Sequence, residues 1–404
     1  MPDLAITPRA APLVRGPRAA TISVFFIHGL LFASWTAHIP QVKDHAGLTV
    51  GALGLALLGA PTGSVSAMLA SARLLPRLGS RRMVQSCLVG YCAAGPLVGL
   101  AGSLPALFAA LFAWGAFQGS LDVSMNTQAV AVERARGRPL MSGFHGCWSI
   151  GTFAGAGAGV AGVAVGMSLT VQLLLLGVPA LVIGEALSAR MLPDAGPPGE
   201  AAVPEHEKRP PRPARRFSRA VLILGAIAFA SMLCEGASAD WASVYLRGPV
   251  HVGAAVAGLG YTAYSLGMVV VRLSGNPLLA RFRVQAVLPV LAALACAGFT
   301  AGLIVGTAAA AIAGFACLGI GLALIVPTVN SAAGRLPGAG PGAAIVAVST
   351  FGWLGFVCGP PLIGALASAT SLPAALGVVP ALVAFIAVAT ALTPQVRTAS
   401  VRRP

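Results

Sequence analysis

Three carboxylic acids stand inside long apolar segments, where a charged side chain is costly. Asp122 lies four positions after Gln118 and four before Asn126, so one helix face carries all three side chains. Glu235 and Asp240 lie in another apolar segment, half a chain further on. A charge at the centre of a bilayer costs about 2.5–3.5 kcal/mol on insertion scales, so these groups are expected to face protein or water. They are candidates for binding a polar solute or carrying a proton, and the alternative is a hydrogen bond that serves only helix packing.

The two acids of the second segment have different expected roles. Asp240 follows Glu235 by five positions, which places them about 140° apart around a helix, so one face cannot hold both. Glu235 is a candidate proton carrier, because removal from water favours the neutral form of a carboxyl group. Asp240 lies nearer the outer end of the segment. It is a candidate for substrate binding or for an outer gate with Lys43 or Arg247.

Imidazole and indole side chains form a second set of candidates. His145 shares a helix face with Trp148 and Ser149, and an imidazole can titrate near neutral pH. The structural alternative for His145 is a hydrogen bond to a backbone carbonyl. Trp35 and Trp241 stand near the expected outer ends of their segments. An indole can stack on a sugar ring or anchor a helix at a membrane interface, and both interpretations stay open.

Composition indicates the elements that must position these residues. The chain has 404 residues, of which 57% are hydrophobic and 9% charged, and its mean hydropathy is +0.85. Soluble domains carry about 25% charged residues, so we predict an all-α membrane protein. Twelve apolar stretches are long enough to cross a hydrocarbon core about 30 Å thick. They lie at 22–42, 51–72, 83–101, 106–130, 141–163, 168–191, 220–245, 253–276, 285–305, 309–332, 343–366 and 373–392.

The twelve segments form two similar sets of six. Three glycines recur 204 positions later in the chain, as Gly54 with Gly258, Gly115 with Gly319 and Gly151 with Gly355. The same offset relates Asn126 to Asn330, which makes Asn330 a further candidate for a central polar site. A repeat of this length predicts two pseudo-symmetric six-helix bundles that can rock about a site between them.

The distribution of basic residues predicts the orientation in the membrane. When twelve spans are threaded from an N-terminus inside the cell, Lys43 and Arg247 are the two of 26 basic residues on the outer side. Arg272 lies within a span, and either snorkelling toward the inner face or pairing with Glu185 would satisfy its charge. We predict a bacterial cytoplasmic membrane protein with both termini inside. Its tails, bundles and linker are expected at 1–20, 21–191, 192–218, 219–392 and 393–404.

The same features argue against other classes of protein. The positive charge follows the inner loops, which favours an orientation signal over a nucleic-acid site. All seven cysteines lie in apolar segments, and none forms a C-x-x-C pair, so we predict neither disulfides nor a metal site. Walker loops and nucleophile elbows are absent from the sequence. We therefore expect neither an enzyme nor a cofactor. The expected partners are a small-molecule substrate, protons and the lipid bilayer, and the expected state is a monomer.

One basic loop carries a family resemblance. It follows the second span and is similar to Gly-x-x-x-Asp-Arg-x-Gly-x-Arg-Arg, the signature loop of the major facilitator superfamily. The matching residues are Arg77, Gly79, Arg81 and Arg82, whereas Ala72 and Pro76 replace the glycine and the acid. This resemblance implies a secondary transporter with a cytoplasmic gate, in which the proline leaves the usual acidic latch without its carboxylate. Glu133 is expected to form an inner-gate salt bridge with this loop.

A narrower resemblance concerns the segments 119–133, 141–151 and 239–241. They resemble a bacterial branch called YbjJ-like, which is related to fucose-permease-type sugar transporters. The branch implies uptake of a small polar, sugar-like solute together with protons. The competing hypothesis is efflux of a drug or natural product by proton antiport, and the basic, glycine-rich composition leaves that hypothesis open.

Overall fold

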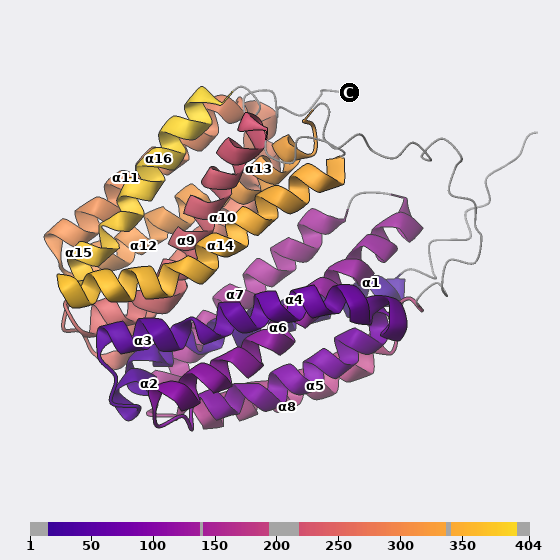
Figure 1. The fold of residues 1–404 in the computed structure, drawn as a ribbon, viewed down its shortest axis with the longest axis horizontal. Helices are drawn as coiled ribbons and strands as arrows, with labels where there is room; N and C mark the ends of the chain where they lie inside the picture. Colours follow the sequence, from indigo (N-terminus) through magenta and orange to yellow (C-terminus); the bar gives the residue numbers. More distant parts are fainter. Residues whose placement is uncertain (1–14, 138–139, 194–217, 337–340, 394–404) are drawn as a thin grey trace, which may run out of the picture.

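The computed structural model describes residues 15–137, 140–193, 218–336 and 341–393, and the regular elements within these ranges are all helices (Figure 1). The predicted linker 192–218 and the predicted tails lie largely outside the described residues. The first half holds α1 (Arg15–Ser34), η1 (Thr36–His38), α2 (Ile39–His45), α3 (Val50–Leu57), α4 (Gly59–Leu78), α5 (Ser80–Val98), α6 (Leu104–Arg136), α7 (Met141–Ala164) and α8 (Leu169–Ser188). The second holds α9 (Arg219–Arg247), α10 (Ala254–Arg281), α11 (Val284–Val305), α12 (Ala308–Leu322), α13 (Ile325–Ala333), α14 (Pro341–Ala369), α15 (Leu372–Leu376) and α16 (Val378–Leu392).

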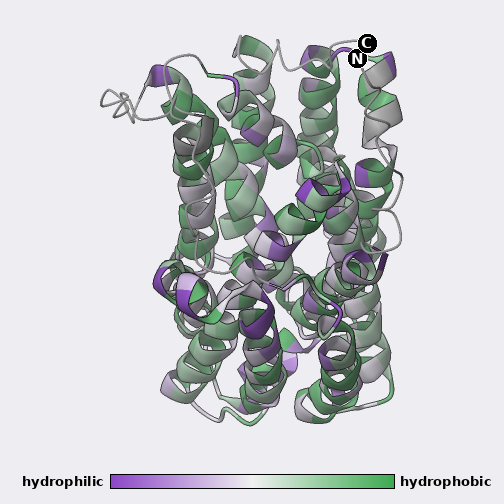
Figure 2. Ribbon diagram, turned by 90° about the vertical axis from the view of Figure 1, so that its right-hand side faces the viewer, coloured by the Kyte–Doolittle hydropathy of each residue, from purple (hydrophilic) through white to green (hydrophobic). Residues whose placement is uncertain are grey.

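The helices confirm the predicted class of all-α membrane protein. Eleven helical segments of the described chain are long and apolar enough to cross a membrane. Helix α5 takes the place of the remaining predicted span, but Arg81, Arg82 and Gln85 lower the hydropathy of its first turns. Hydrophobic residues extend along most of the helices in Figure 2, as expected for surfaces that contact lipid.

The helices run between two ends of the molecule. We call the end that holds Arg15, Ser188 and Arg219 the linker side, and the opposite end, which holds His45 and Arg247, the far side. Several helices begin on the far side at a serine or threonine whose side chain accepts a hydrogen bond from the backbone N–H three residues on, which satisfies a donor that the first turn leaves unpaired. These N-caps are Thr49, Ser103, Ser168, Thr307 and Ser371.

Packing inside the two bundles follows the sequence repeat. Several glycines approach a neighbouring helix so closely that a Cβ atom would meet its backbone, which allows tight packing where no hydrophobic drive joins helices. Close contacts in the first bundle recur 204 positions later, as Gly63–Phe112 with Gly267–Ala316 and Gly115–Ala60 with Gly319–Tyr264. The offset of 204 positions in the sequence therefore relates each of these helix contacts to an equivalent contact in the other bundle, as two pseudo-symmetric bundles require.

The bundles meet on the far side and diverge toward the linker side. Figure 1 shows α14 beside α3 on the far side, while the linker-side ends of α14 and α4 lie apart. The repeat also relates the contacts across this junction, which pair Gly54 with Gly364 and Gly258 with Val160. The Ser243 hydroxyl of α9 adds a hydrogen bond of 2.6 Å to the Thr36 carbonyl. We call these contacts the far-side seam.

A proline, Pro327, accompanies a break in the tenth span. Helix α12 ends at Leu322 and α13 begins at Ile325, so the span consists of two helical pieces. Pro327 has no N–H to offer the carbonyl of Ala323, four residues earlier, and that carbonyl is left without its helical donor. A side chain from another helix can therefore bond to it.

Candidate functional site

Helix α9 carries Glu235 and Asp240 into the interior. All residues from Leu233 to Leu246 on this helix are buried, because α9 packs against α10, α14 and α16 and also contacts α2 and η1 of the first bundle. Each acid retains 9% of its surface. Among described residues neither carboxyl group has a hydrogen bond or an ion pair, and neither has an oxygen sealed from solvent. Both carboxyl groups therefore keep some contact with solvent.

A stripe of polar residues on α10 faces these acids. Tyr261 and Tyr264 are each 2% exposed, and their rings stack with centroids 5.6 Å apart. Tyr261 lies within electrostatic range of Glu235, Asp240 and Arg272. We call these five residues the α9–α10 cluster. It combines two acids, two phenols and one guanidinium within the second bundle.

Arg272 connects this cluster to the first bundle. Its Nη1 donates a hydrogen bond of 2.8 Å to the hydroxyl of Ser149 on α7. Its Nε donates to the Ala323 carbonyl at 3.4 Å, the carbonyl left free by Pro327. The guanidinium thus lies at the junction of the two bundles, where relative motion would change its surroundings.

Neither snorkelling nor a pair with Glu185, the two alternatives that the sequence left open for Arg272, is found in the structure. The guanidinium is not directed to solvent at a helix end, since Nη1 is bonded to Ser149 of α7 and Nε to the Ala323 carbonyl. Glu185 belongs to α8, and its Oε1 is buried without a hydrogen-bond partner. The free Ala323 carbonyl at the helix break and the docking of α7 against α10 explain the difference, and local sequence does not reveal which side chain reaches that carbonyl.

The proposed outer gate of Asp240 is also wrong. Lys43 pairs with its neighbour Asp44 at 3.2 Å. Arg247 donates from Nη1 to the Val252 carbonyl at 3.0 Å, within its own loop. Asp240 lies almost two helical turns inside the end of α9 and stays in the cluster.

The polar stripe of α6 lies where the sequence places it. Gln118, Asp122 and Asn126 are all half-buried on this helix. Asn126 donates from Nδ2 to the Asp122 carbonyl at 2.8 Å and to its Oδ1 at 3.2 Å. Asp122 therefore has the local hydrogen bond that the structural interpretation expected, and one carboxyl oxygen remains for another partner.

The imidazoles of the first bundle have distinct surroundings. His28 of α1 is buried, accepts a hydrogen bond of 2.8 Å at Nδ1 from the Trp148 indole, and stacks on Tyr91. His145 is exposed, with its ring edge-on to Phe25 at 5.4 Å. His145 also lies within electrostatic range of Arg272, so it joins the junction between the bundles.

The aromatic candidates are not placed to stack on a ligand in this conformation. Trp35 is 4% exposed and packs edge-on against Trp114, with centroids 5.9 Å apart. Trp241 is fully buried, and its indole N–H has no partner in the described part of the chain. Both expected roles, stacking and interfacial anchoring, require exposure that the packing of η1 and α9 removes. Asn330 is half-buried on α13.

The signature loop forms a tight turn between α4 and α5. Gly79 has a φ of +81°, a conformation that favours glycine, and it both ends α4 and precedes α5. Arg77 and Arg82 are exposed beside it. Ion pairs between described side chains do not include Glu133. The expected gate salt bridge is therefore not formed in this conformation, in which the linker-side ends lie apart.

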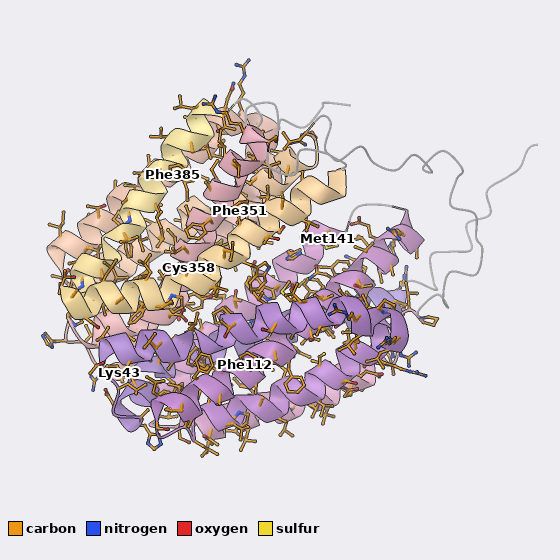
Figure 3. All side chains as sticks on the ribbon, viewed as in Figure 1. Lys43, Phe112, Met141, Phe351, Cys358 and Phe385 are labelled. Atoms are coloured by element: carbon orange, nitrogen blue, oxygen red, sulfur yellow. The ribbon has the colours of Figure 1, made fainter. Side chains whose placement is uncertain are left out.

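Glu133 has a different role at the start of α7. Its Oε2 accepts hydrogen bonds from the backbone N–H groups of Leu140 at 2.6 Å and Met141 at 2.9 Å. Figure 3 labels Met141 at this helix start. A carboxylate at a helix N-terminus satisfies free donors and interacts favourably with the helix dipole.

We expect Glu133→Ala to lower thermal stability more than it lowers transport. Loss of a helix-capping acceptor costs about 0.5–2 kcal/mol, which for a chain of 404 residues corresponds to a fall of about 0.6–2.4 °C in the unfolding midpoint. Glu133→Gln should lose less, since its amide oxygen still accepts. The measurement is thermal unfolding of the purified protein in detergent. Ser142→Ala is the control, because the exposed Ser142 hydroxyl has no described hydrogen bond. Equal midpoints for Glu133→Ala and Ser142→Ala would contradict this role.

Sequence reasoning missed the α10 stripe, although a signal was present. Tyr261, Tyr264, Met268 and Arg272 recur at intervals of three and four, which places them on one helix face. Two of the four tyrosines of the chain stand there, in an apolar span. Acids, imidazoles and indoles were the expected site groups, so the phenols of this stripe were overlooked.

The fold and the polar groups between the bundles define a multi-pass membrane transporter. A model of the Major Facilitator Superfamily matches residues 20–339. The chain is 31% identical over 376 residues to an uncharacterized MFS-type transporter of Yersinia pestis, which covers 92% of this chain and 94% of that protein. It is 32% identical over 354 residues to the membrane protein MosC of Rhizobium meliloti, with 87% and 84% covered. The chain belongs to the Major Facilitator Superfamily.

Solved structures agree on the fold. The nucleoside transporter NupG, in a mutant form, superimposes with a TM-score of 0.72 at 10% identity, and the match covers 92% of this chain and 98% of that one. A bacterial homolog of the human lysosomal transporter Spinster, inward-facing and unoccupied, gives 0.64 at 14% identity, with 99% and 100% covered. At these identities the likeness concerns the fold alone. The resemblance to the superfamily is confirmed, and the narrower branch stays a prediction.

Proposed function

We propose that this chain is a proton-coupled secondary transporter that takes up a small polar organic solute by alternating access. The solute binds between the bundles, and rocking of the bundles exposes it to each side in turn. Closure of the far-side seam with separated linker-side ends supports this cycle, because it corresponds to one of its two end states. We assign the linker side to the cytoplasm of a bacterial inner membrane, on the basis of the arginine-rich inner loops. The monomer is the proposed working unit.

The observation that carries the proposal is the pair of unpartnered acids in α9. Glu235 and Asp240 are buried in an apolar bundle, yet described residues provide neither an ion pair nor a hydrogen bond for them. Ionisable groups inside a membrane are costly and commonly mark ion or substrate pathways. A carboxyl that can take and lose a proton, at the junction of two moving bundles, suits proton coupling. Asp122 on α6 is the third candidate.

Polar groups from both bundles support a polar solute. The α6 stripe and His145 come from the first bundle, and the α9–α10 cluster and Asn330 come from the second. NupG, with which the fold superimposes, is a nucleoside transporter, and a nucleoside is also a small polar solute. The competing proposal is proton antiport of a drug or natural product, which the basic, glycine-rich composition leaves open.

Proton movement in proteoliposomes tests the proposal. The purified protein is reconstituted with a pH-sensitive dye inside, and sugars, sugar acids, nucleosides and cationic drugs are added in turn. We expect a polar solute to acidify the lumen, since solute and proton enter together. If a cationic drug makes the lumen more alkaline and no polar solute has an effect, proton antiport is supported and symport is contradicted. Protein-free liposomes provide the control for passive leakage.

A further inference from the structure

The α9–α10 cluster contains a positive charge, and proton coupling by carboxyl groups does not explain why it is there. Arg272 carries a permanent charge, because a guanidinium is not deprotonated in proteins. The ion pair between described side chains is Lys43–Asp44, so Arg272 has no carboxylate within ion-pair distance. Arg272 is half-buried, and a partly desolvated charge outside any ion pair is costly, which points to a partner that is bound only part of the time.

Some hydrogen-bond donors of the Arg272 guanidinium have no partner among the described residues. Nη1 and Nε are bonded to Ser149 and Ala323, whereas no described residue accepts a hydrogen bond from Nη2. Nη2 is also not among the unpartnered atoms that are sealed from solvent, so it remains accessible. Guanidinium groups present planar, paired donors that match the two oxygens of a carboxylate. The free edge of Arg272 is therefore suited to an oxyanion.

The neighbours of Arg272 determine what kind of anion would fit. Tyr261 and Tyr264 provide stacked rings, and the Tyr264 hydroxyl is buried without a partner in the described structure. The exposed His145 lies on the opposite bundle. Hydroxyl and imidazole groups of this kind can hydrogen-bond the hydroxyls of a solute.

We propose that Arg272 binds the carboxylate of the transported solute, and that this solute is a small hydroxylated organic acid such as a sugar acid. The inference rests on the proposed function and adds the charge class of the substrate. Glu235 lies within electrostatic range of Arg272, so an ionised Glu235 competes with the solute for the same positive charge. Protonation of Glu235 leaves Arg272 to the solute, and release of the proton favours release of the solute. Proton and organic anion then cross together, with no net charge moved.

Matched ligand pairs test the charge class on the full-length protein. Each pair consists of a hydroxylated acid and a neutral analogue, such as glucuronate with glucose and gluconate with sorbitol. Binding is read from the rise in unfolding temperature with ligand concentration. We expect at least one acid to stabilise the wild type while its neutral partner does not. If only neutral members stabilise the protein, or if none of the acids does, the proposal is overturned.

Variants of Arg272 and Ser149 distinguish binding of the solute by Arg272 from a purely structural role of the Arg272–Ser149 hydrogen bond. Arg272→Gln should weaken binding of the acid by about 10- to 100-fold, since it removes a charge-assisted contact. Arg272→Lys should retain part of the affinity, because it keeps the charge but loses the paired donors. Ser149→Ala is the matched control, because it breaks the same interbundle hydrogen bond and leaves the guanidinium in place. If Ser149→Ala weakens binding as much as Arg272→Gln, or if Arg272→Gln binds the acid normally, the proposal fails.

Transport distinguishes this inference from the proposed function. Accumulation of neutral solutes but not acids under a proton gradient would leave proton-coupled uptake in place and reject the role of Arg272. If an acid binds but is not accumulated under any proton gradient, the proposed anion site stands and the proposed proton coupling is rejected. Acid accumulation that is electrically silent in the wild type is the result expected when both are correct.

Discussion

Glu235→Gln is expected to abolish proton-driven accumulation while leaving solute exchange intact. Glutamine occupies nearly the same volume as glutamate but cannot bind and release a proton. A one-unit pH difference can sustain about a tenfold concentration ratio for a solute that moves with one proton, since one unit equals about 1.4 kcal/mol. We expect this ratio to fall to one in the variant. Exchange of labelled for unlabelled solute requires no net proton movement and should continue.

The measurement uses proteoliposomes with an imposed pH difference. Accumulation and exchange are followed with the same labelled solute, so that a folded but uncoupled protein is distinguished from an inactive one. Asp240→Asn and Asp122→Asn are compared, because all three acids are candidates for the coupling proton. Glu185→Gln is the matched control, since Glu185 is another span carboxyl but belongs to α8, outside the α9–α10 cluster. Retention of gradient-driven accumulation in Glu235→Gln would contradict this prediction, and retention in both Glu235→Gln and Asp122→Asn would contradict the coupling assignment as a whole.

Gly54→Leu is expected to open the far-side seam and stop transport. A Cβ atom on Gly54 would lie 2.7 Å from the Pro360 carbonyl oxygen and 3.0 Å from the Gly364 Cα, both on α14. The backbone cannot yield as a flexible side chain would, so leucine forces α3 and α14 apart. Overpacking of this kind costs about 1–3 kcal/mol, and that energy shifts a two-state equilibrium by about 5- to 150-fold. The clash exists only with the seam closed, so the other end state becomes favoured.

Distances between spin labels can measure this shift. Asp44 and Ser371 are exposed on the far side of the first and second bundles, and cysteines can replace them after the seven native cysteines are removed. Gly54→Leu should lengthen the distance between these labels. Gly157→Leu is the control, because a Cβ atom there meets no atom within 4 Å. An unchanged distance in Gly54→Leu would show that the seam does not control the equilibrium.

The fold was largely accessible from the sequence because lipid imposes simple rules. A bilayer requires long apolar helices, and a half-chain repeat requires the two halves to pack alike. The glycine offset recurs as pairs of contacts, of which Gly63–Phe112 and Gly267–Ala316 are one example. Breaks within spans were less accessible. Pro327 suggests one, but the consequence for the Ala323 carbonyl depends on which helix lies beside it.

The site was only partly accessible, for a reason that concerns α9. Helical periodicity separates the roles of two residues only if one helix face is buried and the opposite face is exposed to lipid or solvent. Helix α9 is buried on all sides from Leu233 to Leu246, so the angle between Glu235 and Asp240 does not separate their surroundings. Tyr261 lies within electrostatic range of both. The local pair of Asp122 and Asn126, by contrast, needed only a spacing of four residues.

The contacts of the far-side seam have a consequence for the medium in which the protein works. Backbone approach at Gly54 and Gly258 and the hydroxyl of Ser243 hold this junction, and the ion pair between described side chains, Lys43–Asp44, lies within one bundle. Dissolved salt screens exposed charges beyond about 8 Å at physiological ionic strength, but it leaves van der Waals contacts unchanged. The balance between the two orientations should therefore differ little between dilute and brackish surroundings.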